Sequence, residues 1–460
     1  MSRVLLIGTA LLASFLLQAQ NTLSLPEYLS IIKKYHPVAR QAALGIEIAK
    51  AEVLSSRGAF DPVVTHEKSR KEFGGLLYYD AQLTELRVPT WYGIEVTSGL
   101  ESLSGARTST PETKGNSSYF GFSVPVGKGL LMDRRRADLQ TVRIFQQLSY
   151  QEQSATLNDL FFEAAQAYWN WWQQVQVQAL LAQATRAAEQ RFELVKTTVR
   201  LGDRAAIDTV EALAQLQSFR LRAVEVAVAL ANARLELEAQ LWTQGGEPYT
   251  LPKETVPLYT MPSPLPLDNL LQSVGAHPEL LGYRFKLNVL EVERRLKFQS
   301  LLPSVYLKYN QLTASHNLAK TFSTPWLQNN YRYGLAVSVP LRFSEGRGEY
   351  RQAKLKIEQT VLAASAKRVA LQTKLQQYYN EWSGVQTQLS LQRAATASYA
   401  ALQRAEEVRF NNGESSLFLI NARELKTLEA SEKEVELQSK EGKAVAAAYW
   451  AAGILTTALR

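Results

Sequence analysis

The chain has 460 residues, no cysteine and a formal net charge of +8, from 51 Lys and Arg against 43 Asp and Glu. The absence of cysteine excludes disulfides, thiolate metal sites, cysteine nucleophiles and a lipid anchor on an N-terminal cysteine. We interpret the basic residues as dispersed along the predicted helices. Arg134, Arg135 and Arg136 form the only basic triplet. Because no basic run carries interleaved aromatic residues, we expect no nucleic-acid partner.

Residues 1–19 are predicted to be a secretory signal peptide. Arg3 supplies the positive end, Val4 to Leu17 the apolar core and Ala19 a small residue for cleavage. The alternative is an uncleaved anchor, but an apolar core of 14 residues (17 − 4 + 1) is short for a membrane span. No other stretch of the chain is apolar over 18 residues, so a mature protein that spans a membrane is expected to use a β-barrel.

Two very long helices are predicted, over residues 130–200 and 347–412. The first contains neither Gly nor Pro, and the second contains only Gly384 after residue 348. An unbroken helix of about 72 residues would reach about 108 Å at a rise of 1.5 Å per residue. Helices of this length do not fold back into an ordinary globular domain, so they indicate a coiled-coil rod or the wall of a tube.

The same order of elements occurs twice in the sequence. Pro37 and Pro62 correspond to Pro278 and Pro303 at one offset of 241, without a gap between them. This register indicates a duplication. We therefore predict a first repeat over residues 20–243, a Pro-rich linker over 244–266 and a second repeat over 267–460. The first repeat carries 26 additional residues, interpreted as an added hairpin near 63–90 whose position in the assembly is left open.

Extended segments precede both long helices, and those of the second repeat span 303–343. The segment 331–343 alternates strictly, with apolar side chains on one face. Such alternation is typical of a strand in a membrane β-barrel, although a strand on a soluble core also alternates. The predicted lipid-facing residues are Tyr331, Tyr333, Leu335, Val337, Val339 and Leu341. The stretches 103–118 and 313–328 are predicted to be exposed loops.

Four principal strands, or six with the added hairpin, are too few to close a membrane barrel. Open strand edges are not tolerated in lipid, so several chains must pool their strands. The helices of those chains must then associate around the same axis.

The long helices end at two predicted Gly turns, 201–206 and 411–416, which lead into helices over 207–243 and 417–459. The purely structural interpretation is a pair of αα-hairpin turns, with Asp203 and Ser415 or Ser416 as helix caps. Turns at the end of a tube are also where a gate or a partner would be placed. The candidate gate and docking residues are Arg200, Leu201, Gly202, Asp203, Arg204, Asp208, Glu211, Phe410, Asn412, Gly413, Glu414, Leu417 and Leu419.

The duplicated Leu-Pro…His-Pro starts, the repeated Ser-Val-Pro before each long helix and the two Gly tip motifs occur in one order over residues 21–459. In this the chain resembles the TolC-like outer-membrane channel family of Gram-negative bacteria. The resemblance implies a mainly α-helical homotrimer with a shared 12-stranded β-barrel in the outer membrane and a tunnel of long helices in the periplasm. It also implies partners: outer-membrane lipid, a periplasmic membrane-fusion adaptor and an inner-membrane pump of the RND or ABC type.

The sequence departs from the family's acidic constriction at the second tip. The family carries Asp six and nine residues after the second tip Gly, where this chain has Leu419 and Ala422. Asp208 does match the equivalent position of the first tip. Glu414, Asp208 or Glu211 could supply negative charge, or the constriction could be apolar through Leu417, Phe418 and Leu419.

No catalytic, cofactor or metal motif is present, and the four histidines do not cluster. His36 and His277, each before Pro, and the aromatic cluster around Trp169 are interpreted as structural. We therefore predict a non-enzymatic export channel for drugs, metals or proteins, without a cofactor. The alternative is a soluble periplasmic coiled-coil scaffold or adaptor. The exported substrate, the pump, the adaptor and the state of the gate stay open.

Overall fold

The structure is a computed structural model that describes residues 22–106, 113–260, 263–323 and 325–458. The predicted signal peptide lies outside these residues. The chain divides into two compact units, and each combines segments from both sequence repeats. The helical unit contains Met1–Gln41, Thr156–Gly275 and Leu371–Arg460, and the sheet unit contains Ala42–Ala155 and Ala276–Ala370.

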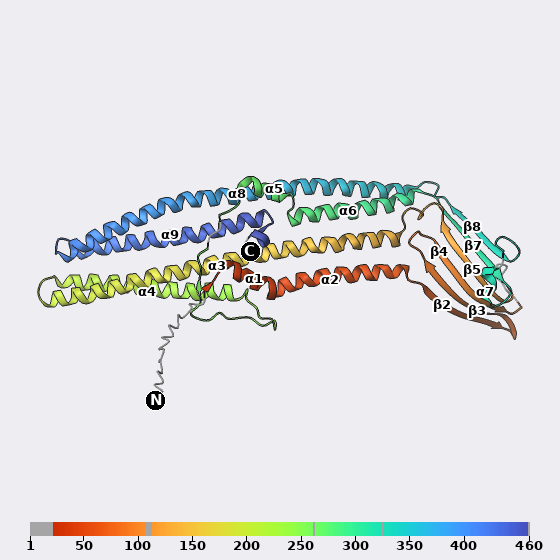
Figure 1. Ribbon diagram of the computed structural model, residues 1–460, viewed down its shortest axis with the longest axis horizontal. Coiled ribbons are helices and arrows are strands. Elements are labelled where there is room, and N and C mark those ends of the chain that lie inside the picture. The colour runs from red at the N-terminus through yellow and green to blue at the C-terminus, as the bar shows by residue number, and fades with distance from the viewer. Residues whose placement is uncertain (1–21, 107–112, 261–262, 324, 459–460) are drawn as a thin grey trace, which may run out of the picture. The chain divides into compact units, whose positions relative to one another are not determined.

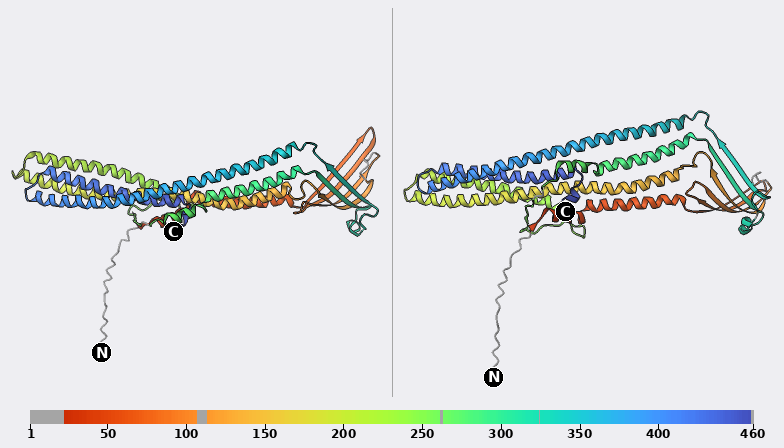
Figure 2. Two further views of the ribbon diagram at one scale, coloured as in Figure 1. Left: turned by 90° about the horizontal axis from the view of Figure 1, so that it is seen from above. Right: turned by 45° about the horizontal axis from the view of Figure 1, so that its top comes forward.

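Four helices dominate the helical unit, although two of them extend beyond it. They are α3 (Arg134–Arg200), α4 (Ala206–Glu238), α8 (Ser344–Asn411) and α9 (Leu417–Ala451). Helix α3 forms a hairpin with α4, and α8 forms one with α9 (Figure 2). The long helices thus fall close to the ranges predicted from the sequence.

Shorter elements complete the helical unit. They are β1 (Thr22–Leu23), which pairs in parallel with β6 (Val256–Pro257), and helices α1 (Leu25–Tyr35), α5 (Leu267–Val274) and α10 (Leu455–Ala458). The hydroxyl of Tyr168 on α3 donates to the carbonyls of Leu23 at 2.8 Å and Leu258 at 2.7 Å. One buried side chain therefore joins a long helix to both segments of the small sheet.

Trp169 is the centre of this unit's aromatic core. It is fully buried, and the Cβ of any larger residue at Gly442 on α9 would lie 2.2 Å from its ring. The hydroxyl of Ser439 donates to the carbonyl of Trp169 at 2.8 Å. Tyr168, Trp171 and Trp172 are also buried. The prediction that this cluster packs the protein interior is confirmed.

The two His-Pro breaks have the same local geometry. His36 precedes α2 (Pro37–Arg57), and its Nδ1 accepts from the backbone N–H of Val38 at 3.2 Å. His277 precedes α6 (Pro278–Phe298), and its Nδ1 accepts from Glu279 N–H at 3.2 Å. Each imidazole satisfies one of the free donors at a helix start. The interpretation of both histidines as structural is confirmed.

The sheet unit holds one antiparallel sheet in the order β2-β3-β4-β5-β7-β8 (Figure 1). The strands are β2 (Val63–Phe73), β3 (Leu76–Pro89), β4 (Glu95–Ser104), β5 (Gly115–Pro125), β7 (Ser304–Thr313) and β8 (Tyr331–Ser338). Short 3-10 turns, η1 (Gly58–Phe60) and η2 (Gln299–Leu301), lead from α2 into β2 and from α6 into β7. Strands β2 and β3 form the hairpin predicted near 63–90, and they extend the sheet at its β4 edge.

Strand β8 is shorter than the sequence pattern predicted. It ends at Ser338, so Val339 and Leu341 lie beyond the strand and are not part of a lipid-facing strand. Pro340 has no N–H to donate to a neighbouring strand, and Phe343 has a positive φ of 49°. Strict alternation does not detect either effect, because it counts side-chain polarity and not backbone hydrogen bonding.

One other segment differs from its prediction. The stretch 313–328, predicted to be a loop, contains helix α7 (Leu318–Ser323), whose Thr321 is buried against the sheet. Strand β4 begins at Glu95, after a turn in which Gly93 has a φ of 82°. Within the described part of the chain, no helix is long and apolar enough to cross a membrane.

Candidate functional site at the helix tips

The two tip turns close in the same way. Gly202 and Gly413 have φ angles of 87° and 80°, a conformation that glycine adopts without strain. The N–H of the next residue then donates back into the helix, from Asp203 to Thr198 O at 3.0 Å and from Glu414 to Arg409 O at 2.9 Å. These bonds satisfy carbonyls at the ends of α3 and α8.

The starts of the return helices differ from each other. Ser416 caps α9, and its hydroxyl accepts from Leu419 N–H at 3.3 Å. The N-cap of α4 is Ala205, which has no capping side chain. The prediction that Asp203 caps this helix is therefore wrong, because the helix starts two residues further along the chain.

An apolar cluster lies directly behind the turns. Phe410 and Leu417 are buried there with Val195, Ala212 and Ile420. Leu201 and Phe418 are 68% and 67% exposed, and Leu419 is 40% exposed. Of the candidate apolar gate residues, Phe410 and Leu417 thus hold the two hairpins together, whereas Leu201 and Leu419 present apolar surface at the turns.

Arg204 connects the two tips. Its guanidinium carbon lies 4.2 Å from the centre of the Phe410 ring, and its Nη1 lies 3.5 Å from a carboxylate oxygen of Asp208. Asp208 therefore does not stand as an isolated negative charge. Glu211 accepts from the amide of Asn421 at 3.5 Å, so two candidate acidic residues are engaged by neighbours in the same chain. Arg200, Asn412 and Glu414 are exposed at the turns.

A buried ion pair joins the hairpins further from the turns. Arg191 on α3 donates to both carboxylate oxygens of Glu424 on α9, at 2.6 and 3.3 Å, and the two side chains are only 11% and 4% exposed. Arg191 also contacts the amide oxygen of Asn421 at 3.4 Å. Sequence reasoning missed this pair, because its partners lie in different repeats and no local spacing relates them.

Helix α4 carries an apolar seam with no partner among the described residues. Its positions follow alternating steps of three and four, all are exposed and all but Gln217 are apolar: Ile207, Val210, Ala214, Gln217, Leu221, Val224, Val228, Ala231 and Leu235. Coiled-coil interfaces have this spacing. Sequence analysis did not single out this run, although the alternating spacing could have identified it.

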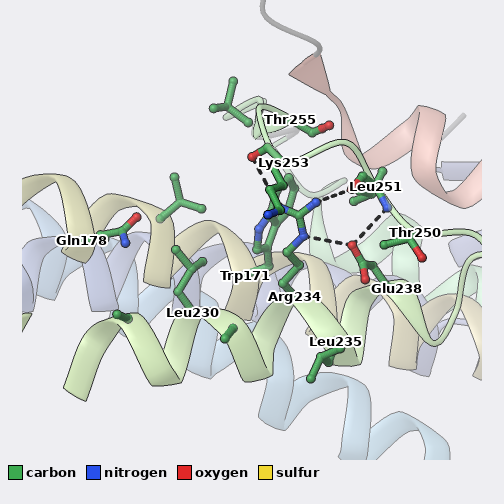
Figure 3. Close-up of a pocket in the computed structure, with 14 residues that line it drawn as sticks. Trp171, Gln178, Leu230, Arg234, Leu235, Glu238, Thr250, Leu251, Lys253 and Thr255 are labelled. Carbon is green, nitrogen blue, oxygen red and sulfur yellow. Dashed lines mark hydrogen bonds and ion pairs between the residues drawn. The ribbon is translucent and has the colours of Figure 1, made fainter. Parts of the chain in front are cut away.

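Next to the seam, α3, α4 and the linker enclose a hollow of about 600 Å³ (Figure 3). Arg234 extends from α4 toward the linker, where it contacts the carbonyls of Leu251, Pro252 and Lys253. Glu238 pairs with Arg234 at 2.9 Å and accepts from Leu251 N–H at 3.0 Å. These bonds hold the linker on the helices. Among the described residues no cluster of acidic or histidine side chains could hold a metal ion.

The sheet has one apolar and one polar face. Cross-strand partners place Tyr333, Tyr309 and Phe122 on one side, with Leu335 beside Leu307 and Val337 beside Val305. Part of this face is covered by the chain itself, since Trp326 stacks on Tyr309 with ring centres 5.3 Å apart. Tyr331, Tyr333, Leu335 and Val337 stay exposed.

The opposite face carries paired polar side chains. Arg87 lies 2.8 Å from Glu85, and the Tyr119 hydroxyl donates to the same carboxylate. Glu101 accepts from Ser117 at 3.2 Å and lies 3.8 Å from Arg332. A sheet with this distribution can separate an apolar surrounding from water.

Solved outer-membrane channels share this fold, in which one chain combines an antiparallel sheet with two long helical hairpins. The CmeC channel of Campylobacter jejuni is similar with a TM-score of 0.66 and 13% identity, over 93% of this chain and 85% of that one. VceC of Vibrio cholerae has a TM-score of 0.65 and 14% identity over 93% and 96%. The open state of the MtrE channel of Neisseria gonorrhoeae has a TM-score of 0.67 and 14% identity over 93% and 88%.

Sequence similarity points to the same class of protein. Residues 270–452 match the sequence model described as outer membrane efflux protein. The resemblance to TolC-like channels drawn from the sequence is thereby confirmed. That family consists of channel proteins and not of enzymes. No curated protein matches the chain.

Proposed function

We propose that the protein is the outer-membrane channel of a tripartite export system and acts as a passive homotrimeric conduit. The helices would lie in the periplasm, where an adaptor would connect them to an inner-membrane pump. The family match and the fold support the class of protein.

The observation that carries this proposal is the unpartnered seam on α4. A long exposed apolar stripe is typical of a helix that packs against another helix. The chain's own helices cover the opposite side of α4, where Ala212, Leu216 and Phe219 are buried. A second copy of the chain would supply the missing partner, and a ring of copies would cover the seam in each.

The free edges of the sheet lead to the same conclusion. Strands β2 and β8 are the two outer strands, and each exposes unpaired backbone groups on one side. In lipid such groups must be satisfied, so edge strands of neighbouring copies would pair. Three copies of a six-stranded sheet supply eighteen strands. The family resemblance implies twelve strands, which corresponds to four strands per chain without the β2–β3 hairpin.

We place the gate at the two tip turns and assign Asp208 to it. Its contact with Arg204, which in turn lies on Phe410, links the α3–α4 turn to the end of α8. Removing the carboxylate would leave Arg204 free to move off Phe410. We expect Asp208→Ala to increase single-channel conductance in planar bilayers.

Asp203→Ala is the matched control, since Asp203 lies in the same turn and no ion pair of its side chain occurs among the described residues. Equal conductance of Asp208→Ala and wild type would remove Asp208 from the gate. A protein that forms no channels and stays in the soluble periplasmic fraction would instead favour the scaffold function.

A further inference from the structure

The positive charge of the chain is concentrated at one end of the sheet. We define the basic collar as residues 54–62, 126–136, 291–303 and 342–356. These 48 residues contain 13 Lys and Arg and 6 Asp and Glu, a net charge of 13 − 6 = +7 out of +8 for the whole chain. Most basic residues lie outside the collar, but there 38 Lys and Arg (51 − 13) face 37 Asp and Glu (43 − 6), so outside the collar the charges nearly cancel.

The four segments come together because each joins a helix to a strand at the same end of the sheet (Figure 1). Backbone bonds connect two of them directly, from Val126 N–H to Val305 O at 2.7 Å and from Lys128 N–H to Pro303 O at 2.8 Å. Lys297 pairs with Glu349 at 2.7 Å, which ties the third segment to the fourth.

Some charged side chains of the collar form ion pairs within the chain, and others form none with the described residues. Arg135 pairs with Glu95 at 2.9 Å, and Arg136 pairs with Asp133 at 3.2 Å. By contrast, Arg342, Arg347 and Arg351 are exposed and make no ion pair with any residue that the structure describes. The collar also exposes apolar side chains, namely Leu131 and Phe298, and the segment directly before Arg342 exposes Val339 and Leu341.

One hollow in the collar combines both kinds of surface. It has a volume of about 420 Å³ and is lined by Arg294, Arg295, Gln299 and Tyr350 together with Leu131 and Phe298. Arg295 is 61% exposed, and its Nε lies 3.6 Å from Glu291. Cationic and apolar side chains in one hollow match an anionic group that is attached to acyl chains.

We propose that the basic collar binds the phosphate head groups of glycerophospholipids in the membrane leaflet on the helix side of the sheet. This inference rests on the proposed function, which puts the sheet in a membrane. The apolar residues at the collar would enter the acyl region, while the arginines would reach the phosphates. An arginine near an anionic membrane surface contributes about fivefold in affinity, and this contribution falls with salt.

The test uses the full chain in nanodiscs of equal parts phosphatidylglycerol and phosphatidylcholine, with retained lipid counted by native mass spectrometry. We expect wild type to enrich phosphatidylglycerol. The double variant Arg347→Gln/Arg351→Gln should lose about fivefold of that enrichment per residue. The control Arg368→Gln/Arg404→Gln removes two exposed arginines from the same helix outside the collar and should keep it.

Equal retention of both lipids by wild type, or unchanged enrichment in the collar variant, would overturn the inference. A preference for lipid A over phosphatidylglycerol in a parallel nanodisc would assign the site to the other leaflet and would also overturn it. If the chain enters bilayers and conducts but shows no lipid preference, only this inference is contradicted. If the chain enters no bilayer, the proposed function is contradicted as well.

Discussion

His36 shows at the residue scale how a single side chain fixes a break between two helices. Its Nδ1 accepts from Val38 N–H, which requires an unprotonated nitrogen. Burial lowers the pKa of His36, against a smaller opposing effect of its hydrogen bond with Gln240. The sequence predicted a structural role from the His-Pro pair. The cap itself depends on the orientation of the imidazole ring, which cannot be inferred from the spacing of residues in the sequence.

The lowered pKa predicts a pH dependence of stability. Between the ordinary histidine pKa of about 6.5 and the lower folded value, the unfolded chain binds a proton that the folded chain does not. Stability should therefore fall as pH decreases through about 6.5. His36→Asn keeps an acceptor without a titrating ring, so its thermal midpoint should fall less between pH 7.5 and 5.5. Parallel losses in both proteins would exclude His36 as the cause.

A second residue-scale prediction concerns the buried pair of Arg191 and Glu424. Glu424→Gln would leave the guanidinium buried without a counter-charge, a loss of about 3–5 kcal/mol. Glu189→Gln breaks the exposed pair with Arg220 and should cost about 0–1 kcal/mol. Thermal unfolding followed by circular dichroism would compare them. Similar midpoints for the two variants would contradict the assignment of Arg191 and Glu424 as a buried link between the hairpins.

At the scale of elements, the long helices were the most predictable part of the fold. The segment 130–200 lacks Gly and Pro, and α3 fills it from Arg134 to Arg200. The strands were less predictable, since β8 stops before Pro340 and α7 forms in a stretch of Ser, Thr and Asn. At the tips, the turns followed from Gly202 and Gly413, whereas the burial of Phe410 required knowing which helices meet.

The α4 seam gives the prediction at this scale. Val224→Glu together with Val228→Glu would place two carboxylates in the seam, where a second helix would have to desolvate them. We expect the assembled species to disappear from size-exclusion chromatography with light scattering. The control, Ser218→Glu with Asn232→Glu, adds the same charge at exposed positions of α4 beside the seam. An assembly that survives the valine substitutions and not the control would contradict the seam as an interface.

At the scale of the whole molecule, two features of the described chain lack a partner. Its sheet has two free edges, and the apolar seam of α4 has no partner among the described residues. Its positive charge gathers where the strands meet the helices. The proposed function would explain each feature by surroundings that one chain does not supply: other copies of itself and a lipid surface.

The most direct measurement is the structure of the purified protein in detergent by electron cryomicroscopy. We predict a ring of three copies in which β8 of one chain pairs with β2 of the next and the α4 seams are covered. A single copy with both strand edges exposed, or a protein that is monomeric in the absence of detergent, would contradict this account.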